Sequence, residues 1–213
     1  MREKWLKAWK HKPYRYALLA SLVFTLIISH YYQQFLLFNE GRSGIDFNDF
    51  VLKFFTPINL SIPIFIAMYS ATIFTAVYVI YSSPILTLKL ALAYTFLLIW
   101  RVFSLSILPL NPPPGLIILY DPFLKHLVYS GRNDVRDLFF SGHTASTFLF
   151  FLIVKNKKLK MYLMACVLIL AIALLAQHLH YSIDILAAPL FAYLAYFPAN
   201  WIIKKANYEK IIS

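Results

Sequence analysis

The sequence predicts an all-α, polytopic membrane protein with six transmembrane helices. Hydrophobic residues make up 61% of the 213-residue chain and charged residues only 14%, whereas a soluble domain carries about 25% charged residues. The mean hydropathy is +0.66. Six apolar stretches come near the length of about 20 residues that a helix needs to cross about 30 Å of hydrocarbon.

The six expected spans follow one another along most of the chain. Three well-separated stretches come first, with a polar loop at 39–57 after the first and a Ser-Ser-Pro break at 82–84 after the second. Three more closely spaced stretches follow. The fourth is short and begins with polar residues, so its start should lie at the interface or line a cavity. The expected spans are 16–38, 58–81, 85–108, 138–154, 159–177 and 181–203.

Lysine and arginine are distributed unevenly between the two sides of this arrangement. With six spans, both chain ends share one side with the loops around Lys89 and Lys155, and 14 of the 20 Lys and Arg residues lie there. The positive-inside rule therefore predicts cytoplasmic termini, with 1–15 as a basic cytoplasmic segment, 16–203 as the membrane domain and 204–213 as a cytoplasmic tail. The net charge of +11 is then a topology signal and gives no reason to expect nucleic-acid binding.

Cysteine and glycine usage excludes several function classes. The one cysteine, Cys166, lies within an apolar stretch, so neither a disulfide framework nor a thiolate metal site is expected. The five glycines form no Gly-rich loop, which excludes a P-loop or a dinucleotide-binding motif.

Ionisable residues within or beside a membrane span are costly, so each one is a candidate for function. His143 and His180 lie at the expected outer starts of the fourth and sixth spans, which places two imidazoles from distant sequence at the same membrane face. His180 and Asp184 are four residues apart and would share a helix face, so the carboxylate can accept from one ring nitrogen. The other nitrogen is then free as nucleophile or base. The spacing is also compatible with a helix start that merely satisfies a polar pair.

The Ser141-Gly142-His143 stretch is typical of a helix start that binds an anion. The serine can cap the helix, while the exposed backbone N–H groups and the helix dipole attract negative charge. Glycine lets that anion approach closely. Two histidines around an anion pocket fit phosphoryl transfer, in which one attacks phosphorus and the other protonates the leaving oxygen.

Zinc binding is the competing chemistry for a His/His/Asp set, but no third imidazole or thiolate is well placed. We therefore expect no metal and no other cofactor. The remaining histidines are expected to be interfacial or solvated side chains: His11, His30, His126 and His178.

Two short motifs surround these histidines: Asp137-Leu-Phe-Phe-Ser141-Gly-His143-Thr and His180-Tyr-Ser-Ile-Asp184. They resemble the two signature stretches of the sphingomyelin synthase family, within the lipid phosphate phosphatase superfamily (type 2 phosphatidic acid phosphatases). The strong resemblance covers residues 137–189, and a weaker one joins Arg101 to the proline-rich turn at 109–115. It implies the six-helix core of that superfamily, with the active site on the non-cytoplasmic face.

The resemblance also implies roles for single residues. His180 would be the nucleophile that forms a phosphohistidine-like intermediate, with Asp184 orienting it. His143 would be the acid for the leaving lipid alkoxide and then the base for the acceptor, while Asp137 would tune the site. A cation–π contact with a quaternary ammonium is a further expectation for the aromatic residue beside His180. The expected substrate-binding residues are Ser141, Gly142, Arg101 and Tyr181.

The chain departs from the wider superfamily because the usual arginine-rich phosphate clamp is missing. Leu174 stands six residues before His180, where the superfamily has a Ser-Arg pair before the last histidine, and no Lys-x6-Arg-Pro pattern occurs. A phosphomonoester carries nearly two negative charges and needs several cations, whereas a zwitterionic phosphodiester carries one. The missing arginines therefore favour the synthase-like branch.

The sequence thus predicts an enzyme, either a phosphotransferase or a phospholipase C-type hydrolase. The expected donor is phosphatidylcholine or phosphatidylethanolamine, and the acceptor is ceramide, another lipid alcohol or water. One alternative is a phosphatase for lipid phosphomonoesters, with Arg101, Arg132 and Arg136 replacing the usual clamp. The other is a non-catalytic lipid-binding protein of the same fold.

Overall fold

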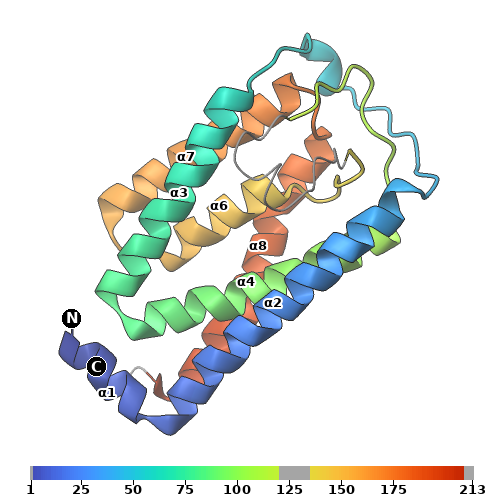
Figure 1. Ribbon diagram of the computed structural model, residues 1–213. Helices are drawn as coiled ribbons and strands as arrows, with labels where there is room; N and C mark the ends of the chain where they lie inside the picture. Colours follow the sequence, from blue (N-terminus) through green and yellow to red (C-terminus); the bar gives the residue numbers. More distant parts are fainter. Residues whose placement is uncertain (1, 120–134, 209–213) are drawn as a thin grey trace.

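The computed structural model describes residues 2–119 and 135–208, and within them the chain is all-α (Figure 1). Five of its helices are long and apolar enough to cross a membrane, which confirms a multi-pass integral membrane protein. The five are α2 (Lys12–Glu40), α3 (Ser61–Ser82), α4 (Pro84–Ile107), α7 (Lys157–Ala176) and α8 (Ser182–Lys205). Three shorter helical elements are α1 (Arg2–Lys10), the 3-10 turn η1 (Leu52–Phe54) and α6 (Gly142–Ile153).

The fourth expected span, 138–154, begins four residues before the helix that the structure has there. The helix found there, α6, has 12 residues and begins at Gly142, so it covers only about 18 Å of the roughly 30 Å hydrocarbon core. The preceding residues stay non-helical because they bind elsewhere: the Phe139 carbonyl accepts from Ser104 Oγ at 2.8 Å, and the Leu138 carbonyl from Arg101 Nη1 at 3.5 Å. Ser141 then caps the helix by accepting from Thr144 N at 3.4 Å.

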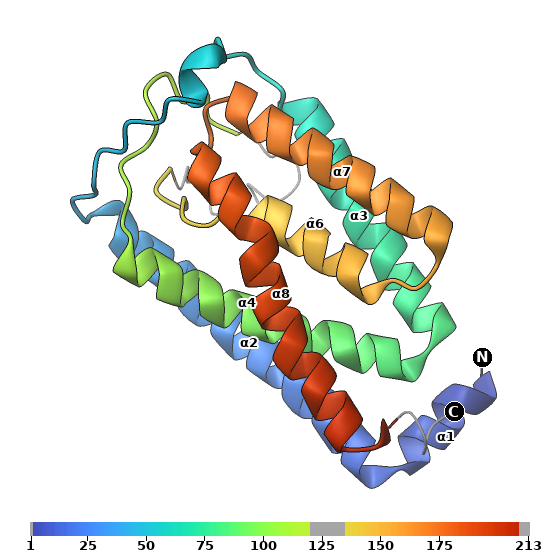
Figure 2. The same ribbon diagram turned by 180° about the vertical axis from the view of Figure 1, so that it is seen from behind.

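The short α6 lies inside the bundle and is surrounded by longer helices. It contacts α3, α4, α7 and α8, while α2 packs along α4 and α3 packs along α7 (Figures 1 and 2). A position among four other helices explains how a helix too short to span can sit at membrane depth, because non-helical backbone is tolerated there where protein surrounds it.

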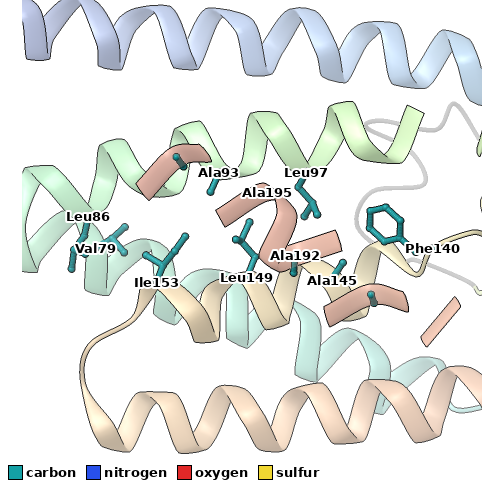
Figure 3. Close-up of a cluster of buried hydrophobic side chains, with 12 residues drawn as sticks. Val79, Leu86, Ala93, Leu97, Phe140, Ala145, Leu149, Ile153, Ala192 and Ala195 are labelled. Carbon is teal, nitrogen blue, oxygen red and sulfur yellow. The ribbon is translucent and has the colours of Figure 1, made fainter. Parts of the chain in front are cut away.

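Alanines on one face of α8 allow this close packing. Ala188, Ala192, Ala195 and Ala199 are fully buried, and their spacing of four, three and four residues places them on one side of the helix. They meet larger side chains of α4 and α6, among them Leu149 (Figure 3). Small residues let helix backbones approach closely in a membrane, which is how α8 brings its first turn beside the start of α6.

Successive helices run in opposite directions through the bundle. The starts of α6 and α8 therefore lie at the same end of the bundle as the end of α4, and we call this the histidine end. At the opposite end, α1 folds back on the bundle. Trp5 Nε1 donates to the Ile80 carbonyl at 2.9 Å, and Tyr14 OH donates to the Pro84 carbonyl at 2.9 Å. The basic N-terminal segment therefore lies far from the histidine end.

Candidate active site

The structure brings His143 and His180 together at the histidine end. His143 is the second residue of α6, and His180 lies two residues before α8. Their ring centroids are 6.4 Å apart, with an interplanar angle of 67°. The two helix starts are joined by a hydrogen bond from Ser141 N to the Asp184 carbonyl oxygen at 3.1 Å. This bond holds the two helix starts together and so keeps the two imidazoles, which are 37 residues apart in sequence, close in space.

Asp184 holds His180 as the spacing predicts. Its Oδ2 lies 3.2 Å from Nδ1 of His180 and also accepts from Tyr181 N at 3.0 Å. Both residues of the pair are buried, with Asp184 fully enclosed. Because Nδ1 donates to the carboxylate, Nε2 is the ring nitrogen that carries the lone pair. The arrangement suits a nucleophile whose tautomer and direction are fixed.

An ion pair between a buried guanidinium and a half-buried carboxylate lies beside the two histidines. Arg101, in α4, is 3% exposed, and its Nη2 contacts Oδ1 of Asp137. Nη2 also donates to the Tyr32 hydroxyl at 3.2 Å, and that hydroxyl donates to Asp137 Oδ1 at 2.6 Å. Arg101, Asp137 and Tyr32 thus each contact the other two, and we call them the Arg101 cluster. Most of the guanidinium charge is therefore already balanced by a carboxylate of the same chain.

The Arg101 cluster touches the start of α6. A Cβ built on Gly142 would lie 3.4 Å from Nε of Arg101 and 3.7 Å from its Cζ. The guanidinium thus packs on the glycine backbone, next to the first turn whose N–H groups point toward the histidine end. Ser141 is fully buried and serves as the cap, while substrate contact by Ser141 or Gly142 stays a prediction.

Tyr181 faces protein. The residue is 2% exposed, its ring packs edge-on against Phe47 at a centroid distance of 5.3 Å, and its hydroxyl donates to the Asn111 carbonyl at 3.0 Å. Burial, helped by the charge of Asp184, raises the pKa of Tyr181, so it remains a neutral hydrogen-bond donor. These contacts give Tyr181 a packing role, and a cation–π contact with a headgroup stays a prediction.

Of the other two arginines that a phosphomonoester site would use, the structure describes only Arg136. Its Nη1 donates to Asn111 Oδ1 at 2.7 Å. Arg132 lies outside the described residues, as does His126. Among residues 2–119 and 135–208, no group of three or more His, Cys, Asp or Glu side chains could hold a metal ion.

Comparison with known families bears on this set of residues. Residues 136–201 match the family model described as PAP2 superfamily C-terminal. The matched stretch contains Asp137, both histidines and Asp184, and the match supports the PAP2 superfamily without distinguishing its sphingomyelin synthase branch. Members of the PAP2 superfamily are phosphatases or phosphotransferases. No curated protein matches the chain.

Two residues near this candidate site were not predicted from the sequence. Tyr32 completes the Arg101 cluster, but it is one of many aromatic residues in an apolar stretch, so nothing in the sequence distinguishes it. Asp49 lies in the loop between α2 and α3 and binds the first residue of α8, Ser182, through its carboxylate. Only the fold brings these residues to the histidines.

The prediction that His178 is interfacial or solvated is wrong. It is 7% exposed, with Nδ1 2.7 Å from the Pro114 carbonyl oxygen and Nε2 2.9 Å from the Phe55 carbonyl oxygen. The neighbouring Gln177 is fully buried and binds Leu60 N at 2.9 Å through Oε1. Side chains of two consecutive residues thus tie the loop before α3 and the loop after α4 to the segment that leads into His180.

Replacing His178 by glycine should lower the stability of this loop attachment. The backbone of His178 has φ of 54°, which glycine adopts freely, so the variant removes the ring without adding strain. A neutral imidazole donates to only one of the two part-buried carbonyl groups, so the variant loses about one hydrogen bond, at a cost of about 0.5–1.5 kcal/mol. Thermal unfolding in detergent should show a lower melting temperature than wild type, while His30→Ala, on the exposed face of α2, should not. An unchanged melting temperature would show that the loops are held without the imidazole.

Proposed function

We propose that the protein is a membrane phosphotransferase that moves a phosphocholine or phosphoethanolamine headgroup from a glycerophospholipid to ceramide, another lipid alcohol or water. The observation that carries this proposal is the His143–His180 pair, in which His180 is buried and His143 is half-buried, with Asp184 on Nδ1 of His180. A nucleophile held in one tautomer beside a second imidazole has the parts needed for a two-step transfer. The match to the PAP2 superfamily supports the same reaction class.

In the first step, Nε2 of His180 attacks the phosphorus of the donor lipid. The bond between phosphorus and the diacylglycerol oxygen breaks, and its electron pair leaves with that oxygen. His143, as imidazolium, gives its proton to the oxygen, so diacylglycerol departs as an alcohol. The headgroup phosphate remains on His180, and the carboxylate of Asp184 stabilises the positive charge that develops on the ring.

In the second step, the neutral His143 removes a proton from the acceptor hydroxyl. The acceptor oxygen attacks phosphorus, the bond from phosphorus to Nε2 breaks, and its electron pair returns to the ring of His180. A lipid alcohol gives a new phosphodiester, whereas water gives the free phospho-alcohol. The two imidazoles finish in their starting protonation states.

The Arg101 cluster supports a phosphodiester over a phosphomonoester. Arg101 and Lys89 are the buried cations of the described residues, and Lys89 binds Asn200 at 2.8 Å. Lys89 lies in the first turns of α4, near the opposite end of that helix from Arg101. Since Arg101 is paired with Asp137, the site offers roughly one shared cation, which suits a singly charged phosphate better than a doubly charged one.

The alternatives differ in what they turn over. A lipid phosphate phosphatase would release inorganic phosphate from phosphatidic acid, and it would need the Arg101 charge to become free. A non-catalytic lipid-binding protein would bind lipid without product, but it gives no reason for placing two imidazoles side by side with a buried carboxylate on one of them. The proposed placement of the site on the non-cytoplasmic face follows from the charge distribution of the loops.

The decisive experiment is a donor comparison with the purified protein in liposomes. Phosphatidylcholine and phosphatidylethanolamine, labelled in the glycerol part, should release diacylglycerol, with or without added ceramide. Phosphatidic acid should be turned over much more slowly. Faster release from phosphatidic acid would favour the phosphatase, and binding of all three lipids without product would favour the non-catalytic protein.

A further inference from the structure

Asp49 is a buried carboxylate whose hydrogen bonds, within the described residues, go to its own loop and to Ser182, two residues after His180. It is 7% exposed although it lies in the loop between α2 and α3. Its Oδ1 accepts from Val51 N at 2.9 Å and Leu52 N at 3.2 Å, which shapes the loop around it. Both oxygens also bind Ser182: Oδ2 accepts from the backbone N–H, and Oδ1 accepts from Oγ at 3.0 Å.

Ser182 is the first residue of α8 and lies two residues after His180. Its N–H belongs to the first turn of the helix, where no intrahelical acceptor exists. The carboxylate of Asp184 takes the preceding N–H, that of Tyr181, at 3.0 Å. Two carboxylates therefore bind two consecutive N–H groups, and they fix the path of the chain immediately after the nucleophile. One of them comes from 133 residues away in sequence.

The contacts also keep Asp49 charged. Burial acts to raise the pKa of Asp49, but the hydrogen bonds from Ser182, Leu52 and Val51 outweigh it and hold the pKa below its usual value. A carboxylate at a helix N-terminus is stabilised by the helix dipole. Tyr181 is the titratable group on which Asp49 acts, and Asp184 and Asp46 act on the same tyrosine.

We propose that Asp49 is a positioning residue for the reaction, holding the start of α8 so that Nε2 of His180 is directed at phosphorus. This rests on the proposed function, because it assumes that His180 is the nucleophile. Asp49 touches no reacting atom. It acts through Ser182 on the direction of the imidazole, and its negative charge adds to that of Asp184 when the ring becomes positive in the first step.

The test compares Asp49→Asn with Asp46→Asn. Both variants lose one carboxylate from the same loop, but Asp46 is exposed and accepts from the side chain of Asn111. Asp49→Asn should lower kcat by about 10–100-fold, because small displacements of a reacting group cost about that much. KM should stay within about twofold, since lipid binding is not altered. Asp46→Asn should retain wild-type kcat and KM.

Ser182→Ala provides a partner variant that removes one of the four hydrogen bonds to Asp49. In a double-mutant cycle, the kcat losses of Asp49→Asn and Ser182→Ala should be less than additive, because both break the same contact. Hydrogen exchange of the peptide 178–186 should be faster in Asp49→Asn than in Asp46→Asn, and this readout does not depend on turnover. Melting temperatures identify any variant that fails to fold.

The outcomes separate this proposal from the proposed function. If wild type turns over no lipid, the proposed function fails. Faster hydrogen exchange at 178–186 in Asp49→Asn would still show that Asp49 holds the start of α8 in place. If wild type is active and Asp49→Asn matches Asp46→Asn in kcat, the positioning role is overturned. A rise in KM at unchanged kcat also overturns it, because it would place Asp49 in substrate binding.

Discussion

Replacing His180 by alanine should leave no measurable release of diacylglycerol from reconstituted protein. The variant has no nucleophile, so the headgroup cannot be transferred through a covalent intermediate. Replacing His143 by alanine should lower turnover by about 10²–10⁴-fold, the range typical of a lost general acid and base. His30→Ala is the matched control, because it removes an imidazole from the exposed face of α2 without touching the site.

A labelled donor distinguishes the roles of the two histidines. After a base quench, which preserves a bond between phosphorus and nitrogen, a headgroup label should be found on His180 in wild type and more slowly in His143→Ala. His180→Ala should carry none. A label found on His143 would reverse the assignment, and full turnover in either variant would exclude the two-histidine mechanism.

The helical framework could be predicted from the sequence because a membrane span has a simple signature. Long apolar stretches set five of the six helices to within a few residues. The His180–Asp184 contact was predicted from the four-residue spacing of a helix face, although His180 lies two residues before α8 and the carboxylate reaches back to its ring. Both predictions depend only on local geometry.

The start of α6 and the pairing of Arg101 could not be predicted in this way. Residues 138–141 are apolar enough to continue the helix, but the Ser104 hydroxyl and the Arg101 guanidinium bind their carbonyl groups. Asp137 was expected to tune the site, and the structure shows the contact through which it can do so, an ion pair with a residue 36 positions earlier. Contacts of this kind depend on which helices pack together.

Asp49 is a further residue whose role could not be predicted from the sequence. A single acid in a polar loop is the commonest kind of surface residue, and Asp46 nearby is one. Only the approach of the loop to the start of α8 distinguishes the buried acid from the exposed one. The structure therefore brings the predicted residues His143, His180 and Asp184 together, whereas the loop residue Asp49 could be found only from the fold.

Asp137→Asn should destabilise the protein and change its substrate preference. The substitution keeps the shape of the side chain but leaves the buried guanidinium of Arg101 without its counter-ion. Removing one partner of a buried ion pair costs about 3–5 kcal/mol, and the lower end applies because the Asp137 side chain is 29% exposed. The melting temperature of Asp137→Asn should fall, and the double variant Arg101→Gln with Asp137→Asn should recover part of the loss, because no unpaired charge remains.

The change in preference follows from the charge that Asp137→Asn releases. A phosphate with nearly two negative charges can replace the lost carboxylate as partner of Arg101, while a zwitterionic phosphodiester brings only one. The ratio of phosphatidic acid to phosphatidylcholine turnover should therefore rise by about tenfold or more, which corresponds to only about 1.4 kcal/mol of preferential binding in the transition state. The double variant should lose this gain because it has no guanidinium. A folded Asp137→Asn protein with the wild-type ratio would show that the Arg101 cluster supports the fold and does not select the substrate.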